Sequence, residues 1–482
     1  MNLLENVKWA SVSQFFKVIV QIANLVILTR FIKPDDYGLM AISMIFINFG
    51  LLLKDQGLSK AIIQKLNLKI EVVNAVFWFG IYASLFVYLI IYFSADLIAD
   101  FYESEELTVI LRTIALIFPI GALGSVHVAL LERESKFKLV AFVELSCSIV
   151  SFIVAIVLAY LGYGVYALVF QAISYSVLNT LLMILSKSFS ISISSSLKLG
   201  PIKEVLSFSV NLFLFNVINF FSRNLDNILI GKFLGVISLG TYNLAYRIMQ
   251  FPLQSITFVF SRALLPVVSK AQNDNKNIER MYLNCVFSIA FLVFPLMIFL
   301  TNFGVETVII FIGEEWKVTG EILEWLAICS CFQCINSLSG SIFMAKDRTK
   351  FLLRLGSAGA VIHITGFIVG INFDIVSFSK IYVVTTVINS VLVLYFTTLI
   401  INSSIFRVFS KVKGILAYSL VSLLIVTNLS ESLDGNAFFQ NDIVNILSKS
   451  FIYACLYLTM IVLLSSDAKL AINNLINRNS NN

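Results

Sequence analysis

Ionisable side chains stand inside several strongly apolar stretches of this sequence. Arg223 and Asp226 lie three residues apart, between LFLFNVINFF and NILIG. A spacing of three residues places two side chains on the same face of a helix. A charge at the centre of a membrane costs at least about 2.5–3.5 kcal/mol, so such groups turn toward protein or water. The pair therefore indicates a polar surface on a membrane-spanning helix.

The chemistry that these residues offer is the binding of an anionic, hydroxyl-rich molecule. Arginine binds pyrophosphate oxygens in a bidentate manner, and lysine supplies a point charge. Asparagine and glutamine side chains donate to and accept from sugar hydroxyl groups. The candidate binding residues follow one face of two helices, with one more in the next helix: Lys17, Gln21, Asn24, Asn216, Asn219, Arg223, Asp226 and Arg247.

Two acidic residues are candidates for coupling transport to an ion. Asp226 is expected either to neutralise Arg223 or to take up a proton or Na⁺. A carboxylate that has lost its hydration is stabilised by a cationic partner, or it takes up a proton because its pKa is raised. Glu144 lies one or two turns inside another apolar stretch. The sequence leaves structural alternatives open: an Arg223–Asp226 ion pair that only locks helices together, a Lys17 that snorkels to the interface, an Arg247 that anchors there, and a Glu144 that serves packing.

The composition is typical of an integral membrane protein. Of 482 residues, 59% are hydrophobic and 13% are charged, whereas soluble domains carry about 25% charged residues. The mean hydropathy is +0.91. We predict an all-α integral membrane protein with about 14 transmembrane helices, since each needs about 20 apolar residues. The range is 12 to 14, and the stretches lie near 9–29, 37–53, 73–93, 107–131, 140–161, 163–185, 205–231, 241–261, 282–303, 322–344, 352–373, 376–401, 412–429 and 446–465.

The loops predict the orientation and exclude several classes of function. With the N-terminus inside, about 24 Lys and Arg residues fall on the inner side and about 7 on the outer side. We therefore expect a bacterial cytoplasmic (inner) membrane protein with both termini in the cytoplasm. The net charge of +6 reflects this topology, and no nucleic-acid motif is present. The loops are too short for a soluble catalytic domain, so we do not expect an enzyme.

An internal repeat divides the chain. TRFIKPDDYGLM (29–40) aligns with GKFLGVISLGTY (231–242), an offset of 202 residues (231 minus 29), and SKAII (59–63) aligns with SRALL (261–265). Each half then holds six helices, and an even number makes the repeats parallel, as in many transporters. We predict a six-helix lobe at 1–200, a second at 201–403, and two extra helices with a short tail at 404–482.

The repeat relates the two polar stripes to each other. At the same offset Arg223 aligns with Gln21, and Asp226 aligns with Asn24. Both halves thus place polar residues at the same depth of their first helix. We expect the stripes to face each other across a central cavity, because polar groups avoid lipid.

Several motifs occur in a fixed order over the first two thirds of the chain. They are TRFIKPDDYGLMAIS (29–43), DQGLSKAIIQK (55–65), FYESEEL (101–107), LLERESKF (130–137), LDNILIGKFLGVISLGTYNLAYRI (225–248), GEEW (313–316) and LEWLA (323–327). With this order and topology, the chain resembles the polysaccharide flippases of the multidrug/oligosaccharidyl-lipid/polysaccharide exporter superfamily. It looks most like the branch that includes the colanic acid exporters.

The resemblance implies a MATE-like fold of two helical lobes. It implies a flippase that moves a saccharide unit on undecaprenyl pyrophosphate from the inner to the outer leaflet by alternating access. The unit would serve lipopolysaccharide O-antigen, capsule or exopolysaccharide synthesis, and the glycan stays open. It also implies partners: the lipid bilayer, the lipid-linked glycan, and a polymerase and glycosyltransferases of the same pathway. The family has no metal and no catalytic residues, and a coupling H⁺ or Na⁺ stays open.

Other functions fit the residues less well. A multidrug or cation exporter of the same fold needs an acidic and aromatic site, whereas Lys17 and Arg223 are basic. A membrane polysaccharide polymerase or ligase carries a large external loop, which is absent here. A glycosyltransferase needs an acidic metal cluster at the inner face, where the loops are basic. A cell-wall precursor flippase uses the same lipid carrier, so the chemistry of these residues does not exclude that function.

Some residues favour structural roles. The thiols of CSCFQC (329–334) lie in an apolar span without other ligands, so we expect no metal site. His127 and His363 are expected to be hydrogen-bonded packing residues. Trp316 is expected in the outer interfacial belt. In KPDDYG (33–38), Asp35 and Asp36 are expected to cap the next helix.

Overall fold

The computed structural model describes residues 19–55, 62, 69–186, 217, 220–221, 223–272, 274–434 and 442–464. These residues form helices joined by turns and short loops, with no strand among them. Eleven helices or helix pairs in this part are long and apolar enough to cross a membrane. They coincide with eleven of the predicted stretches, which confirms the all-α membrane class. Stretches 9–29 and 205–231 lie largely outside the described residues. Stretch 241–261 is shared among α11 (Val236–Pro252), the π-helical turn η4 (Leu253–Thr257) and α12 (Phe258–Lys270).

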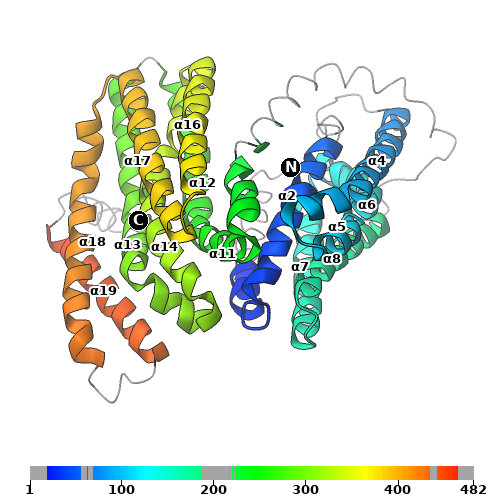
Figure 1. Ribbon diagram of the computed structural model, residues 1–482. Coiled ribbons are helices and arrows are strands. Elements are labelled where there is room, and N and C mark those ends of the chain that lie inside the picture. Colours follow the sequence, from blue (N-terminus) through cyan, green and yellow to red (C-terminus); the bar gives the residue numbers. More distant parts are fainter. Residues whose placement is uncertain are drawn as a thin grey trace. The chain divides into compact units, whose positions relative to one another are not determined.

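The chain forms two compact units, Met1–Gly240 and Thr241–Asn482, called unit 1 and unit 2 below. The predicted lobe boundary at residue 200 lies outside the described residues, so the three-part division stays a prediction. The long helices of unit 1 (Figure 1) are α2 (Pro34–Asp55), α4 (Ile70–Tyr102), α5 (Glu106–Ile114), α6 (Ile117–Arg133), α7 (Phe137–Tyr160) and α8 (Val165–Leu185).

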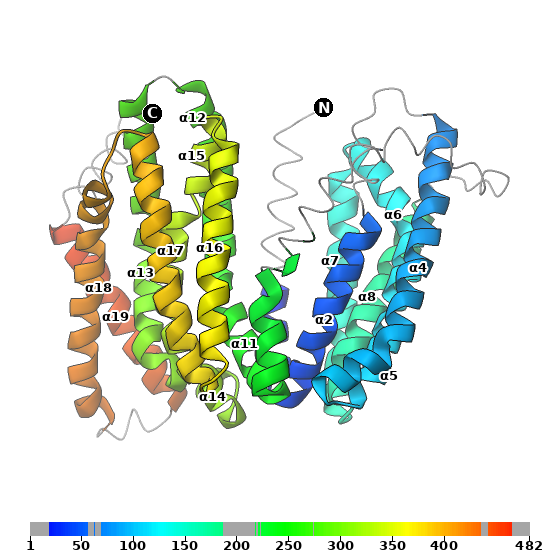
Figure 2. The ribbon, with the colours of Figure 1, turned by 45° about the horizontal axis from the view of Figure 1, so that its top comes forward.

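Unit 2 is built around one long helix, α13 (Asn275–Phe311). Its other helices are η5 (Glu314–Trp316), α14 (Lys317–Asn336), α15 (Ser339–Ala345), α16 (Thr349–Gly370), α17 (Ile375–Ile400), α18 (Ile405–Asp434) and α19 (Asp442–Leu464). The two extra helices predicted beyond the repeats correspond to α18 and α19. Both pack against α13 (Figure 2), so they form part of unit 2.

The start of α2 also organises the start of α8. Pro34 is the first residue of α2, where its fixed φ suits the helix and its missing N–H costs nothing. Asp36 Oδ1 accepts a hydrogen bond of 2.9 Å from the backbone N–H of Val165, the first residue of α8. Gly164 has φ +52 and lies against this carboxylate. Asp36 therefore caps a helix 129 residues further along the chain. It also lies in the first turn of α2, as expected, where its carboxylate bonds to the backbone of Lys33.

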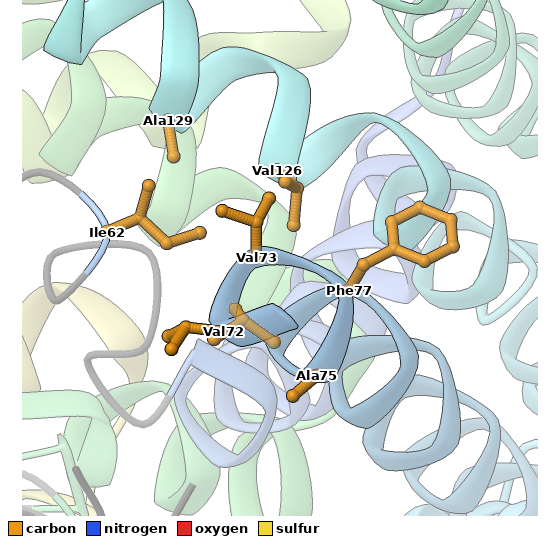
Figure 3. Packing of buried hydrophobic residues seen from close by; sticks show 8 residues of the cluster. Ile62, Val72, Val73, Ala75, Phe77, Val126 and Ala129 are labelled. Atoms are coloured by element: carbon orange, nitrogen blue, oxygen red, sulfur yellow. The ribbon is translucent and has the colours of Figure 1, made fainter. Parts of the chain in front are cut away.

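Interdigitated aliphatic side chains join α4 to α6 in unit 1. Val73 and Phe77 of α4 pack with Val126 and Ala129 of α6, and Ile62 completes the cluster (Figure 3). Each of these side chains is less than 9% exposed. Lipid tails are as apolar as these residues, so van der Waals packing between close helices stabilises the contact.

Helix α13 is kinked at Phe303, whose φ −111 and ψ 18 leave the helical range. The kink has a visible cause on the neighbouring α14. Glu324 Oε1 accepts a hydrogen bond of 3.2 Å from the N–H of Val305. A Cβ on Gly320 would lie 2.5 Å from Val305 Cα, so glycine allows α14 to approach α13 at this point.

Trp316 differs from its expected place. Its side chain is fully buried within unit 2, at 0% exposure, and it is the largest fully buried side chain among the described residues. The prediction of an interfacial belt position was therefore wrong. The residue ends the short 3₁₀ turn η5, which turns the indole into the packing between α13 and α14.

The N-terminus of α17 yields a test of local stability. Asp374 accepts hydrogen bonds of 3.1 Å from the N–H groups of Val376 and Ser377. Hydrogen bonds from the Ser377 side chain and then its backbone lower the pKa of Asp374. The carboxylate therefore stabilises the helix above its ordinary pKa of 3.8, and this stability is lost as the pH falls through the lowered value.

We expect Asp374→Ala to lower the free energy of unfolding by about 1 kcal/mol at neutral pH, as for other helix caps. Thermal unfolding of the variant and the parent protein in detergent, near neutral pH and near pH 3, measures the difference. The difference should shrink at the lower pH. Equal differences at both pH values would contradict the assignment of the cap to the carboxylate.

Candidate functional site

The predicted polar stripes are only partly visible. Lys17, Asn216 and Asn219 lie outside the described residues. Gln21 is exposed and Asn24 is half-buried, and both belong to the apolar helical segment Ile19–Leu28. The first stripe therefore stays a prediction, of which two amides are located.

Arg223 and Asp226 lie in different surroundings. Arg223 is exposed, whereas Asp226 is only 6% exposed. Asp226 Oδ1 accepts a hydrogen bond of 2.8 Å from the backbone N–H of Asn227. The ion-pair role and the anion-binding role of Arg223 both stay predictions.

The segment that carries Arg223 lies against α2. The rings of Phe220 and Phe221 lie 5.5 and 5.2 Å from the ring of Phe49 of α2, measured between centroids. Aromatic pairs at these distances add to the packing of two helices. Arg223 therefore stands beside an aromatic surface that belongs to unit 1.

A second polar region lies among α2, α6, α7 and α8 inside unit 1. The half-buried Glu144 of α7 acts electrostatically on Glu132 of α6 and on Tyr175 of α8. Glu144 therefore faces other titratable groups, and its coupling role stays a prediction. The predicted stretch 37–53 ends one residue before Lys54, which belongs to the last turn of α2.

Lys54 is a cation that sequence reasoning missed. Its side chain is half-buried. A Cβ on Gly121 of α6 would lie 3.7 Å from Lys54 Nζ and 3.6 Å from Ser176 Oγ of α8. The ammonium group therefore lies against α6 and α8, inside unit 1. The sequence held one signal for this role: Lys54 directly follows the apolar run of α2 and is not separated from it by a loop.

The last candidate, Arg247, is exposed on α11. Its neighbour Tyr242 is fully buried and contacts the ring of Phe378 of α17 at 5.8 Å. Tyr242 also stacks on Tyr246 at 6.0 Å. α11 is thus fixed to unit 2 by tyrosines, and Arg247 points away from that packing. Binding and anchoring roles of Arg247 both stay predictions.

Lys449 is a second missed cation. It lies four residues into the last predicted span, and its side chain is 3% exposed. Lys449 Nζ lies 3.2 Å from Glu306 Oε2 and 5.4 Å from the centre of the Phe303 ring. The ion pair therefore joins α19 to the kink of α13.

A network of neutral polar groups crosses α14, α16 and α17. Gln333 Nε2 donates to Tyr382 OH at 3.1 Å, and Asn336 Nδ2 donates to Ser390 Oγ at 2.7 Å. His363 Nδ1 lies 3.1 Å from Thr385 Oγ1. The prediction that His363 is a hydrogen-bonded packing residue is confirmed. Since no member carries a formal charge at neutral pH, the network serves helix association.

An ion pair at the end of α4 joins two distant segments of unit 1. Lys232 Nζ lies 2.7 Å from Glu103 Oε1 and 5.3 Å from the centre of the Phe101 ring. The side-chain hydrogen bond from Lys232, and then its charge, lower the pKa of the Glu103 carboxyl. The Glu103 carboxyl is thus charged at neutral pH.

The arrangement suits binding and movement of a solute. Exposed or half-buried cations and amides recur along the helices of unit 1. Among the described residues, no group of three or more His, Cys, Asp or Glu side chains is placed to hold a metal ion.

A family model described as "Polysaccharide biosynthesis protein" matches residues 27–321. Two curated relatives extend the similarity. The "Teichuronic acid biosynthesis protein TuaB" of Bacillus subtilis is 26% identical over 72% of this chain and 72% of its own. The "Lipopolysaccharide biosynthesis protein WzxC" of Escherichia coli is 22% identical over 76% of this chain and 75% of its own.

Solved structures with the same fold are membrane transporters. The lipid II flippase MurJ, in an inward closed conformation, superposes with a TM-score of 0.74 at 16% identity. The match covers 96% of this chain and 99% of that one. An inward-facing MATE family multidrug transporter superposes with a TM-score of 0.59 at 16% identity, over 81% and 94% of the two chains. At these identities the likeness concerns the fold, and it confirms the predicted MATE-like class.

Proposed function

Because the chain belongs to the polysaccharide biosynthesis protein family, we propose that it is a flippase for a lipid-linked oligosaccharide. The substrate is a repeat unit carried on undecaprenyl pyrophosphate, which moves from the inner to the outer leaflet. The observation that carries this proposal is the agreement of two independent matches. The family match spans the end of the first predicted helix through the start of α14, and the fold match to a lipid flippase covers 96% of the chain.

The described residues support an anionic substrate. Arg223 is exposed beside aromatic rings of unit 1, and Lys54 lies half-buried among three helices. A pyrophosphate group needs such cations, and sugar hydroxyls need amides such as Gln21 and Asn24. We propose that Arg223 and Lys17 hold the pyrophosphate and that the amides contact sugar. The lipid tail stays in the bilayer while the head group crosses.

We propose that the protein moves its substrate across the membrane without changing it chemically. The protein exposes its binding site to the two sides in turn, as repeat-built transporters do. Asp226 and Glu144 are the groups proposed to couple this cycle to H⁺ or Na⁺, since both are removed from bulk water. No cofactor is required. The chain is proposed not to be an enzyme, because relocation of a lipid-linked unit forms no covalent bond.

The membrane orientation belongs to the same proposal. Many apolar helices make this a multi-pass membrane protein. The excess of Lys and Arg in one set of loops places that set, with both termini, in the cytoplasm. The membrane is then the bacterial cytoplasmic membrane. Glycosyltransferases that supply the unit and a polymerase that consumes it are the proposed partners.

The lipids of cells that lack this gene test the proposal. Lipid-linked oligosaccharides are extracted and separated, and surface polysaccharide is measured in parallel. We expect a complete repeat unit on undecaprenyl pyrophosphate to accumulate while surface polysaccharide is lost. Unchanged pools of both would contradict the proposal and direct attention to efflux of organic cations, the alternative function considered from the sequence.

A further inference from the structure

The hydrogen-bond ladder of α13 is interrupted at Pro295, in the middle of the helix. In an α-helix each N–H group donates to the carbonyl oxygen four residues earlier. Proline has no N–H, and its ring crowds that carbonyl. The carbonyl oxygen of Phe291, four residues before Pro295, therefore loses its regular donor. Within a membrane, such a carbonyl needs a donor from a neighbouring helix.

Tyr457 of α19 supplies that donor. Its hydroxyl group donates to the carbonyl oxygen of Phe291 at 3.0 Å, across 166 residues of sequence. Tyr457 is 3% exposed, and its ring lies 5.9 Å from the ring of Phe291, measured between centroids. Ring packing thus fixes the tyrosine at this position, and its hydroxyl takes the place of the N–H that Pro295 lacks.

The same face of α19 contacts α13 at two further points. Lys449, Tyr453 and Tyr457 are spaced by four residues, so their side chains share one face of the helix, and all three are buried. The ring of Tyr453 lies 5.4 Å from the ring of Phe299. Lys449 pairs with Glu306 at 3.2 Å, beyond the kink of α13. α19 therefore contacts α13 on both sides of its proline and on both sides of its kink.

We propose that α19 is a brace that holds the interrupted helix α13 in shape, and that Tyr457 acts as the hydrogen-bond donor that Pro295 lacks. The sequence predicts that α18 and α19 lie outside the internal repeat, and the inference gives the last helix a role of its own. It goes beyond the proposed function, because it concerns unit 2 alone and holds for any transported molecule. The hydroxyl of Tyr457 then matters only while residue 295 has no N–H.

A double-mutant cycle tests this dependence. Tyr457→Phe removes the hydroxyl and keeps the ring, and Pro295→Ala restores the N–H. A buried acceptor without a donor is destabilising, so we expect Tyr457→Phe to lower the midpoint of thermal unfolding in detergent by about 3–6 °C. In protein that also carries Pro295→Ala, the shift should be at most about a third as large. Equal shifts in both backgrounds, or no shift in the parent protein, would overturn the proposal.

The matched control removes another hydroxyl from the same face of α19. Tyr453→Phe lies one turn before Tyr457, and the Tyr453 hydroxyl has no hydrogen bond to α13 among the described residues. We expect the shift that this change causes to be the same with and without Pro295→Ala. A dependence on residue 295 as large as that of Tyr457 would contradict the specific role of the Tyr457 hydroxyl.

Hydrogen exchange followed by mass spectrometry shows where the effect lies. Amides exchange through local opening, so an opening that becomes easier by about 1.4 kcal/mol exchanges tenfold faster. We expect Tyr457→Phe to raise the exchange rate of segment 288–300 of α13 on the order of tenfold. Exchange in α16, which packs on α17, should stay unchanged. No rise in α13, or an equal rise in α16, would contradict a brace that acts on α13.

Loss of folded protein in Tyr457→Phe would decide the question as well. Size-exclusion chromatography in detergent measures the folded fraction, and the double variant with Pro295→Ala should then recover it. Failure to recover would overturn the proposal, as would a Pro295→Ala protein that does not fold, since the restored N–H should be accepted at this position. These measurements need no substrate, so their outcome does not depend on the lipid-linked oligosaccharide.

Discussion

Replacement of Arg223 with alanine is expected to abolish translocation of the lipid-linked oligosaccharide without loss of protein from the membrane. Arg223 is exposed, so its removal leaves no buried partner unsatisfied. A charge-assisted hydrogen bond contributes about 1.5–3 kcal/mol, and a bidentate contact with pyrophosphate supplies two. The initial rate of translocation should therefore fall by at least about a hundredfold. Arg223→Lys keeps the charge and should retain part of the rate.

Rates are compared in vesicles with matched amounts of each variant. The control is Arg280→Ala, which removes an exposed arginine whose Nη2 lies 3.1 Å from Asn277 Oδ1 at the start of α13. That variant should translocate at the parental rate. Lys17→Ala is expected to behave like Arg223→Ala. Parental rates in both Arg223→Ala and Lys17→Ala would refute the assignment of the anion site.

Removal of Glu306 is expected to produce the largest loss of stability among single substitutions outside the candidate binding residues. Lys449 is buried, and its ammonium group lies 3.2 Å from the Glu306 carboxylate. Breaking a fully buried ion pair costs about 3–5 kcal/mol, because one charge stays behind. Glu306 is 48% exposed, and water can partly replace it. Glu306→Ala should therefore lower the free energy of unfolding by about 2–3 kcal/mol.

Unfolding in detergent by heat or denaturant measures this change. The double variant Glu306→Leu with Lys449→Met removes both charges and should recover most of the lost stability, as replaced buried pairs do. Asp96→Ala breaks the more exposed pair with Arg112 and should cost about 0–1 kcal/mol. A double variant that is less stable than Glu306→Ala would contradict the account of the pair.

Length and apolar content were sufficient to locate most helices. Eleven predicted stretches coincide with helices of spanning length, because a membrane sets a minimum apolar length for each of them. Stretch 241–261 is helical throughout, but Pro252 and the π-helical turn after it divide it between α11 and α12. Neither feature changes the hydropathy, so only the backbone reveals it.

Contacts between distant residues could not be predicted from local patterns. Tryptophan is a residue type common at membrane interfaces, but the packing of α13 and α14 buries Trp316. Lys449 stands in an apolar run, and its partner Glu306 is 143 residues away. Asp36 has the local pattern of a cap for α2, and its hydrogen bond to the start of α8 could not be read from that pattern. In each case tertiary packing decides the role of the side chain.

In the candidate site, too, local sequence patterns predict some features and tertiary packing decides others. Helical spacing predicts one face for Arg223 and Asp226, but their exposures differ because neighbouring helices cover one side only. The repeat aligns Gly38 with Gly240. Equivalence does not imply contact, and only the structure shows that each glycine lies against the other's helix. The binding residues as a set stay a prediction.

Reconstitution tests the central claim most directly. Purified protein is placed in vesicles that carry the undecaprenyl-pyrophosphate oligosaccharide from gene-deleted cells, and the fraction of sugar accessible from outside is followed with time. The account predicts that sugar held in the inner leaflet becomes accessible at a rate proportional to the amount of active protein, and that Arg223→Ala removes this dependence. Accessibility that does not change with the parental protein would contradict it.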